Sequence, residues 1–410
     1  MVNFKRFTLN NGLRVVVHED KTTPMAVLNI LYDVGARDEN PEQTGFAHLF
    51  EHLMFGGSVN IPSYDEALQV VGGENNAFTS NDITNYYITL PSVNLETAFW
   101  LESDRMLGLA FSEKSLEVQK NVVCEEFKQR YLNQPYGDLW LKLRPLVYKQ
   151  HPYRWATIGE KLSHIENAQM QDVKAFFVKH YNPQNAILVV GGNVDFDEVK
   201  ALCEKWFEPI VGNKYQRNLP IEPEQTEAVL ATVYADVPLN AIYKVFKMPG
   251  KTDVDYPVVD LISDILSQGK SSRLYRNLIK DNPLFSDIKA YNYGSLDTGM
   301  FVIEARPNED VSLEVAENAI WAELTTLKTN LMGNDELTKV KNKYESTTIF
   351  SEMNLLDKAM NLGFYELMGD ADLINIELEK YKCVTPQHIQ RLANQIFTEE
   401  NSTTLHYLAK

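Results

Sequence analysis

A polar, proline-bearing stretch between residues 209 and 227 separates two segments of similar length, in which the order of predicted helices and strands repeats. In the first segment, a helix predicted at Asp172–Tyr181 precedes an apolar strand at Asn185–Val190. In the second, a helix at Pro386–Ile396 precedes a strand at Thr403–Leu408. This recurrence predicts a duplicated domain with a linker between the copies. We therefore expect two domains, at residues 1–215 and 225–410.

The first segment alternates short strands with amphipathic helices, which indicates an α+β fold. We expect each domain to be a mostly antiparallel sheet with helices covering one side. Strands are predicted in the first segment at Lys5–Leu9, Leu13–Glu19, Met25–Val34, Asn76–Thr79, Tyr86–Leu90 and Asn185–Val190. Helices are predicted at Gly45–Phe55, Ser63–Val71, Leu95–Gly108, Lys114–Tyr131, Asp172–Tyr181, Asp197–Trp206, Leu313–Thr329 and Asp335–Ser351.

The 410 residues include 39 Lys and Arg against 56 Asp and Glu, a formal charge of −17. This negative charge repels phosphate backbones and anionic lipid surfaces, so neither nucleic acid nor a membrane is an expected partner. Cys124, Cys203 and Cys383 are too widely spaced for a disulfide framework or a thiolate zinc site. The sequence as given opens on a strand pattern, which predicts a cytoplasmic protein; a periplasmic or secreted protein is the alternative if a signal segment was removed.

The segment His48-Leu49-Phe50-Glu51-His52 carries the clearest chemical signal, an H-x-x-E-H pattern within a predicted helix. At 3.6 residues per turn, His48 and His52 lie on one face, so both imidazoles can reach a single Zn²⁺. Glu51 lies beside that face, where its carboxylate can take a proton from a water molecule that zinc has activated. The pattern is the inverse of H-E-x-x-H and predicts a zinc peptidase with one zinc ion per chain.

Two histidines leave this site one ligand short, because a catalytic zinc usually has three protein ligands and an open fourth position. The helix predicted over residues 114–131 is the best source of the missing carboxylate. Adjacent helical residues point about 100° apart, so only one of Glu125 and Glu126 can face the histidines. The residues alone leave Glu117, Glu125 and Glu126 as candidates.

Five segments together resemble the pitrilysin/insulinase family of zinc metallopeptidases, and the resemblance spans roughly residues 7–192. The segments are Leu9-Asn-Asn-Gly-Leu-Arg-Val-Val-Val, Gly35-Ala-Arg-Asp-Glu, His48-Leu-Phe-Glu-His-Leu-Met-Phe-Gly-Gly, Gly72-Gly-Glu-Asn-Asn-Ala-Phe-Thr-Ser-Asn-Asp and Asn121-Val-Val-Cys-Glu-Glu. The resemblance implies duplicated α+β domains that form half of a clamshell chamber. It also assigns the third ligand to Glu126, 74 positions beyond His52, and leaves Glu125 as a neighbour.

The same resemblance assigns the substrate to the predicted strand Asn76-Ala77-Phe78-Thr79, which is the edge strand of the sheet in such enzymes. An unpaired edge binds the main chain of an extended peptide whatever its side chains are. An ordinary buried strand is the competing interpretation of these residues.

The sequence departs from the family at two places. Many members have a second glutamate seven residues before the third ligand, where this chain has Gln119, which can hydrogen-bond near the metal but supplies no charge. Members also grip the substrate with an Arg and a Tyr in the second domain, and by alignment Ile279 and Ser286 occupy those positions. The missing pair predicts a homodimer, or a heterodimer with a sister subunit that carries the Arg and Tyr.

Together these features predict a zinc-dependent endopeptidase that hydrolyses peptides or short unfolded segments, with residues 1–215 catalytic and residues 225–410 lacking the metal motif. One alternative is a zinc-binding subunit that is inactive without a partner chain. Another is a non-catalytic assembly subunit, against which the complete set of His48, Glu51, His52 and Glu126 argues.

Overall fold

The computed structural model describes residues 1–410 and divides the chain into two compact units. Neither unit is contiguous, so the units are not the segments 1–215 and 225–410 expected from the repeat. The reason is that a short segment from each half of the chain packs with the other half. Unit 1 consists of Met1–Arg130, Trp155–Pro220 and Ile349–Ile376, and unit 2 consists of Tyr131–Arg154, Ile221–Thr348 and Glu377–Lys410.

Unit 1 is built on a six-stranded sheet in the order β1-β2-β6-β3-β5-β4. Only β2 and β6 pair in parallel; the other neighbours are antiparallel. Because β4 pairs with β5 alone, it forms one edge of the sheet. The strands are β1 (Lys5–Thr8), β2 (Arg14–Glu19), β3 (Met25–Tyr32), β4 (Glu74–Thr79), β5 (Thr84–Pro91) and β6 (Ala186–Gly192).

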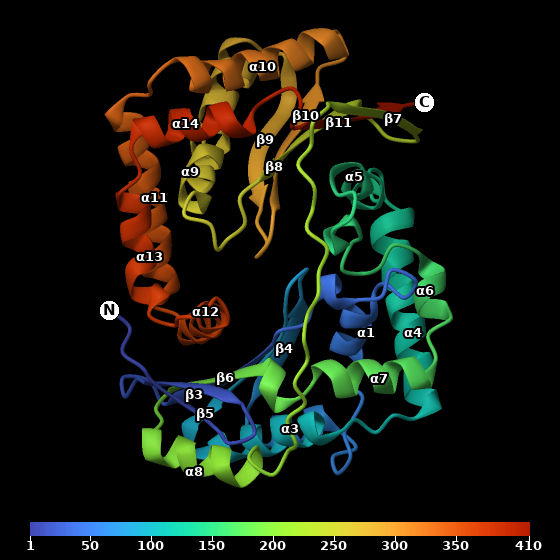
Figure 1. Cartoon of the computed structure of the whole chain (residues 1–410), viewed down its shortest axis with the longest axis vertical. Coiled ribbons are helices and arrows are strands. Elements are labelled where there is room, and N and C mark those ends of the chain that lie inside the picture. Colours follow the sequence, from blue (N-terminus) through green and yellow to red (C-terminus); the bar gives the residue numbers. More distant parts are fainter. The chain divides into compact units, whose positions relative to one another are not determined.

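Helices cover both faces of this sheet rather than the single side expected. Successive side chains of a strand point to opposite faces, and every residue of β6 is buried. Helix α12 (Leu355–Leu367) packs on one face against Val27, Leu31 and Val189, and α3 (Leu95–Leu107) contacts β3 and β5 from the other (Figure 1). The remaining helices of unit 1 are α1 (Phe46–Leu53), α2 (Tyr64–Val70), α4 (Glu113–Phe127), α6 (Leu162–Glu166), α7 (Met170–His180) and α8 (Phe196–Trp206).

Unit 2 contains a five-stranded sheet in the order β7-β11-β8-β10-β9. Its first pair is parallel and the rest are antiparallel, the same sequence of pairings that runs from β2 to β4 in unit 1. This repeated topology is the structural form of the repeated element order. The strands are β7 (Val229–Ala235), β8 (Ala241–Met248), β9 (Phe285–Tyr293), β10 (Gly299–Pro307) and β11 (Ser402–Ala409).

Helix α5 (Leu139–Val147) belongs to unit 2 although it lies early in the chain. Leu139, Leu143 and Val147 recur every four residues and form one apolar face, which packs with Tyr243 and Val302 of the second sheet. Conversely, α12 comes from the second half of the chain and packs on the first sheet. The other helices from this part of the chain are α9 (Tyr256–Ser267), α10 (Leu313–Thr329), α11 (Asn334–Ser351), α13 (Leu373–Lys382) and α14 (Pro386–Ile396).

The predicted element positions are close to those observed. α10 and α14 have the predicted bounds, and Ser112 caps α4 by accepting the backbone N–H of Ser115, as its position before the helix indicated. α4 ends at Phe127 rather than at residue 131, because the backbone continues as a π-helical turn over Lys128–Leu132. None of the helices combines the length and the apolar composition needed to cross a bilayer.

Candidate metal centre

Helix α1 follows a glycine N-cap, and a side chain from outside the helix accepts its first N–H groups. Gly45, the N-cap, has φ +91°, and a Cβ there would lie 2.6 Å from the carbonyl oxygen of Ile158. Glycine offers no side-chain acceptor to the unpaired N–H groups of the first turn. The carboxylate of Glu39 takes that role, accepting the N–H of Gly45 and the N–H of Ala47, each at 2.8 Å. Glu39 is buried, and this burial raises its pKa well above the ordinary value.

The apolar face of α1 consists of buried residues, among them Leu49, Phe50 and Leu53. His48 and His52 therefore lie on the remaining face, one turn apart, with ring centroids 4.9 Å from each other. The side chains are 12% and 25% exposed, respectively. The local sequence thus places both imidazoles beside each other at the edge of the core.

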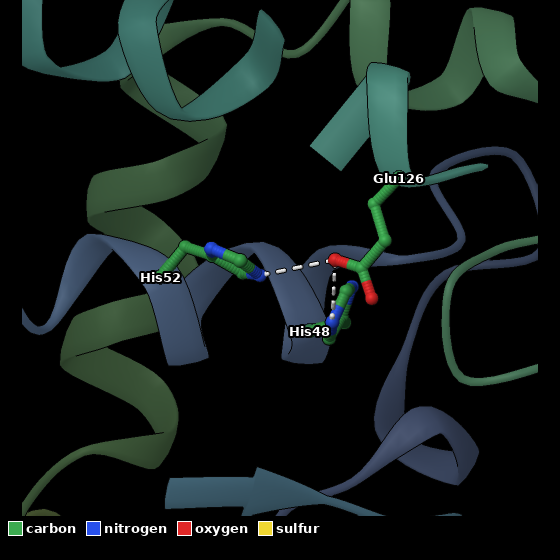
Figure 2. Close-up of side chains that lie close together, drawn as sticks. All are labelled: His48, His52 and Glu126. Carbon is green, nitrogen blue, oxygen red and sulfur yellow. Dashed lines mark ion pairs between the residues drawn. The ribbon is translucent and has the colours of Figure 1, made fainter. Parts of the chain in front are cut away.

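Glu126 approaches these rings from the last turn of α4 (Figure 2). Its Oε2 lies 3.7 Å from Nε2 of His48 and 3.5 Å from Nε2 of His52. Glu125 is instead mostly exposed and pairs with Lys128 at 2.7 Å, and Glu117 is exposed and pairs with Lys120 at 3.3 Å. Of the three candidate carboxylates, the structure brings only Glu126 to the histidines.

The three side chains fit a zinc ion. One ligand atom from each of His48, His52 and Glu126 lies within 4.8 Å of the others. Zinc–ligand bonds of ~2.0–2.2 Å in a tetrahedron place neighbouring ligand atoms about 3.4 Å apart, close to the 3.5 and 3.7 Å observed. The 3.5 Å separation is long for an N–H···O hydrogen bond, so hydrogen bonding alone explains the convergence poorly. Two imidazoles and a carboxylate are also a ligand set that catalytic zinc uses.

The charges at this centre favour the metal-binding forms of the ligands. Burial lowers the pKa of His48 to about 4, so its imidazole is neutral near pH 7. The contact with His52 lowers the pKa of Glu126, and Arg130 lies 3.1 Å from its Oε1. Nδ1 of His48 is buried without a hydrogen-bond partner. A neutral imidazole beside a carboxylate anion is the state that binds a cation.

Glu51 lies on α1 beside the centre and is half-buried. Its Oε2 accepts a hydrogen bond of 2.6 Å from the hydroxyl of Thr79. Burial raises the pKa of Glu51, while the Thr79 hydrogen bond and the charge of His52 act in the opposite direction.

The segment Asn76-Ala77-Phe78-Thr79 lies on the edge strand β4, as the resemblance implied. Ala77 and Thr79 are half-buried, whereas Asn76 and Phe78 are exposed. The backbone N–H of Ala77 donates to Oδ1 of Asn76 at 2.8 Å, and Phe78 is 40% exposed. The strand therefore offers a free edge next to the helix that carries the histidines, with which it is in contact.

The remaining predicted residues are not among the converging ligands. Gln119 is half-buried on α4, two turns before Glu126. Ile279 packs against the core of unit 2, and the hydroxyl of Ser286 donates to the carbonyl of Arg306 at 3.1 Å.

Sequence reasoning missed residues that hold α1, or the segment that leads into it, from outside the helix. Besides Glu39, the guanidinium of Arg217 donates to Asp38 at 2.7 Å and to Asp33 at 2.9 Å. Asp38 is buried and belongs to the short 3-10 turn Ala36–Asp38, directly before Glu39. Arg217 lies in the stretch interpreted as a linker, and no local pattern links it to residues almost 180 positions earlier.

Two family models match the chain. The one described as "Insulinase (Peptidase family M16)" matches residues 14–138, and the one described as "Peptidase M16 inactive domain" matches residues 167–344. "Zinc protease PqqE" of Helicobacter pylori is 32% identical over 406 residues, which cover 97% of this chain and 91% of the relative.

Solved structures share the fold of this chain. A protease from Helicobacter pylori superposes with a TM-score of 0.92 at 30% identity, covering 99% of this chain and 100% of that chain. The periplasmic protease PqqL from Escherichia coli superposes with a TM-score of 0.81 at 19% identity. That match covers 100% of this chain but 48% of PqqL, so the fold found here corresponds to about half of the longer protein.

Proposed function

The chain belongs to the insulinase family of peptidases, M16, and on that basis we propose that it is a zinc-dependent endopeptidase acting on peptides or short unfolded segments. The observation that carries the proposal is the convergence of His48, His52 and Glu126 around one point, with Glu51 beside them. This set contains a ligand for each of three zinc positions and a separate carboxylate for proton transfer.

Each residue has a distinct role in this proposal. His48 and His52 bind the metal through their imidazoles, and Glu126 binds it through its carboxylate. The chemistry that zinc supplies when bound is the activation of a water molecule and the polarisation of a peptide carbonyl. Glu51 accepts the proton of the attacking water on its carboxylate and later donates that proton to the leaving nitrogen. The burial that raises the pKa of Glu51 favours this second step.

The edge of β4 is the proposed substrate-binding element. Its outward-facing backbone groups can pair with an extended peptide, which selects a backbone conformation rather than a particular side chain. Asn76, Ala77, Phe78 and Thr79 would form this contact. Displacement of the Asn76 side chain from the N–H of Ala77 would make that donor available to the peptide.

A second candidate is a zinc-binding subunit that needs a partner chain, either another copy or a sister subunit. Two points favour it. By alignment with the family, Ile279 and Ser286 occupy the positions of a substrate-gripping Arg and Tyr, and PqqL is about twice as long as the part this chain matches. In this proposal residues 1–215 supply the catalytic part and residues 225–410 a homologous, metal-free part. The compartment stays a prediction; PqqL is described as periplasmic.

The deciding experiment incubates the purified chain with a mixed library of quenched fluorescent peptides, with and without a zinc chelator. Cleavage that the chelator abolishes and added zinc restores supports a self-sufficient peptidase. Bound zinc without cleavage supports the partner-dependent subunit, and analytical ultracentrifugation then tests for self-association. Absence of both zinc binding and cleavage would refute both proposals.

A further inference from the structure

Thr79 joins the proposed substrate strand to the proposed base. It is the last residue of β4, and its Oγ1 donates to Oε2 of Glu51 at 2.6 Å. Hydrogen bonds to a carboxylate are shorter and about twice as strong as those between neutral groups. The contact spans 28 residues of sequence and links a strand to a helix.

The alternation of β4 determines which way this hydroxyl faces. Asn75, Ala77 and Thr79 are half-buried on one face of the strand, whereas Glu74, Asn76 and Phe78 are exposed on the other. The hydroxyl of Thr79 is therefore directed to α1, while the backbone edge of the same strand is left for pairing with a peptide. The strand thus contacts α1 through the side chain of Thr79 and leaves its backbone edge free for a peptide.

A glutamate on a helix has several rotatable bonds, and its backbone alone does not determine where its carboxylate lies. A catalytic group must be held within about 0.5 Å of its working position, and a misplacement of about 1 Å can cost about 100-fold in rate. The hydrogen bond from the Thr79 hydroxyl narrows the orientations that are open to the Glu51 carboxylate.

We propose that Thr79 is a positioning residue that holds the Glu51 carboxylate in register with the peptide bound along β4. In this arrangement the strand that pairs with the substrate backbone also holds the carboxylate of the base, so one strand orients both. Thr79 acts through Glu51 and does not itself exchange a proton with the substrate.

The test rests on the proposed function and uses the full chain. The variants are Thr79→Val, which keeps the shape and strand preference of threonine but removes the donor, and Thr79→Ser, which restores it. We expect Thr79→Val to lower kcat by about 10- to 100-fold with KM within about twofold of the original. Thr79→Ser should recover most of the loss, and zinc content should be unchanged in both.

Thr22→Val is a matched control, because Thr22 also donates its hydroxyl to a carboxylate, that of Asp20 at 2.5 Å, on an exposed turn outside the site. It should leave kcat and KM unchanged. A Thr79→Val enzyme with original kcat, or one whose kcat loss accompanies a matching loss of zinc or of folded protein, would overturn the proposal.

A second measurement separates this proposal from the proposed function. Crystal structures of the metal-free original and Thr79→Val proteins should show a single Glu51 orientation in the first and several, or a displaced one, in the second. An unchanged Glu51 in the variant contradicts the positioning role whatever the activity. If instead the original protein shows no chelator-sensitive cleavage, the proposed function fails, while the structural comparison still decides the role of Thr79.

Discussion

Glu39 accepts the backbone N–H of Ala47, one residue before His48, at 2.8 Å through Oε1. Its other oxygen accepts the N–H of Gly45 at the same distance. A residue outside the helix thus satisfies two donors of the first turn, in place of the side chain that the N-cap glycine lacks. The position of α1, which carries both histidines, consequently depends on Glu39.

Replacing Glu39 should weaken both folding and metal binding. In Glu39→Ala, two buried N–H groups lose their acceptors, and we expect the free energy of unfolding to fall by about 2–4 kcal/mol. Zinc affinity should fall as well, because α1 is less firmly held. Glu39→Gln keeps an acceptor oxygen, so its stability and zinc affinity should lie between those of the original protein and those of Glu39→Ala. Denaturant unfolding and zinc titration measure these effects; Glu42→Ala, an exposed change nearby, is the control and should do neither.

The adjacent pair Glu125 and Glu126 offers a matched test of the third ligand. Glu126→Gln should weaken zinc binding by at least about 100-fold, because it removes an anionic ligand that lies beside both imidazoles. Glu125→Gln makes the same chemical change on a mostly exposed side chain and should bind zinc as the original does. Metal analysis after dialysis against a chelator compares the two. Equal zinc loss from both variants would refute the assignment.

Glu51→Gln should separate metal binding from catalysis. The amide cannot accept the proton of the attacking water, so kcat is expected to fall by about 10²- to 10⁴-fold. Zinc content should stay at one ion per chain, because Glu51 is not among the converging ligands. Peptide cleavage and metal analysis are measured on the same sample, with the exposed change Glu66→Gln as a control. Original turnover in Glu51→Gln would exclude this residue as the base.

A partly buried ion cluster in unit 2 predicts a pH dependence of stability. Glu317 lies 2.7 Å from Nε2 of His406 and 2.9 Å from Nζ of the buried Lys244. The contact with His406, followed by that with Lys244, lowers the pKa of Glu317 to about 2 from an ordinary 4.5. Because this pKa is lowered in the folded state, ionised Glu317 stabilises the fold. Its contribution to the free energy of unfolding is complete above pH 4.5 and disappears as the pH falls toward about 2.

Glu317→Gln should therefore reduce the free energy of unfolding by about 1–3 kcal/mol at pH 7. The difference from the original protein should shrink as the pH falls from about 4.5 toward 2. Denaturant unfolding at a series of pH values follows it. Glu309→Gln removes the same charge at an exposed site and should show a much smaller, pH-independent difference. A constant difference for Glu317→Gln down to pH 2 would contradict the proposed ion pairing.

Because α12 comes from the second half of the chain and packs on the first sheet, we expect that the first half of the chain does not fold by itself. Residues 1–215 lack α12, which covers the sheet face formed by Val27, Leu31 and Val189. We expect this fragment to bind a hydrophobic dye and to unfold without a cooperative transition. Adding a peptide of residues 349–376 should reduce dye binding, whereas a scrambled peptide should not. Cooperative unfolding of the fragment alone at the temperature of the full chain would show that α12 is dispensable.

The sequence alone determines the parts of this protein that depend on neighbours in the chain. His48, Glu51 and His52 are related by helical periodicity, so their common location follows wherever that helix forms. The strands of the first sheet and the bounds of α10 and α14 follow from the same local patterns. The family resemblance added Glu126, among three carboxylates that local spacing could not distinguish.

Only the tertiary structure shows what depends on packing between distant segments. The convergence of Glu126 with the histidines depends on how α4 packs against α1. Three sets of hydrogen bonds join residues that no local period relates. Glu39 accepts from the start of α1, Thr79 donates to Glu51, and Arg217 donates to Asp38. The packing of α5 on the second sheet and of α12 on the first likewise depends on which sheet face the apolar side of each helix covers. A helix stripe specifies that a face is buried but not against which partner, because any apolar surface of suitable shape satisfies it.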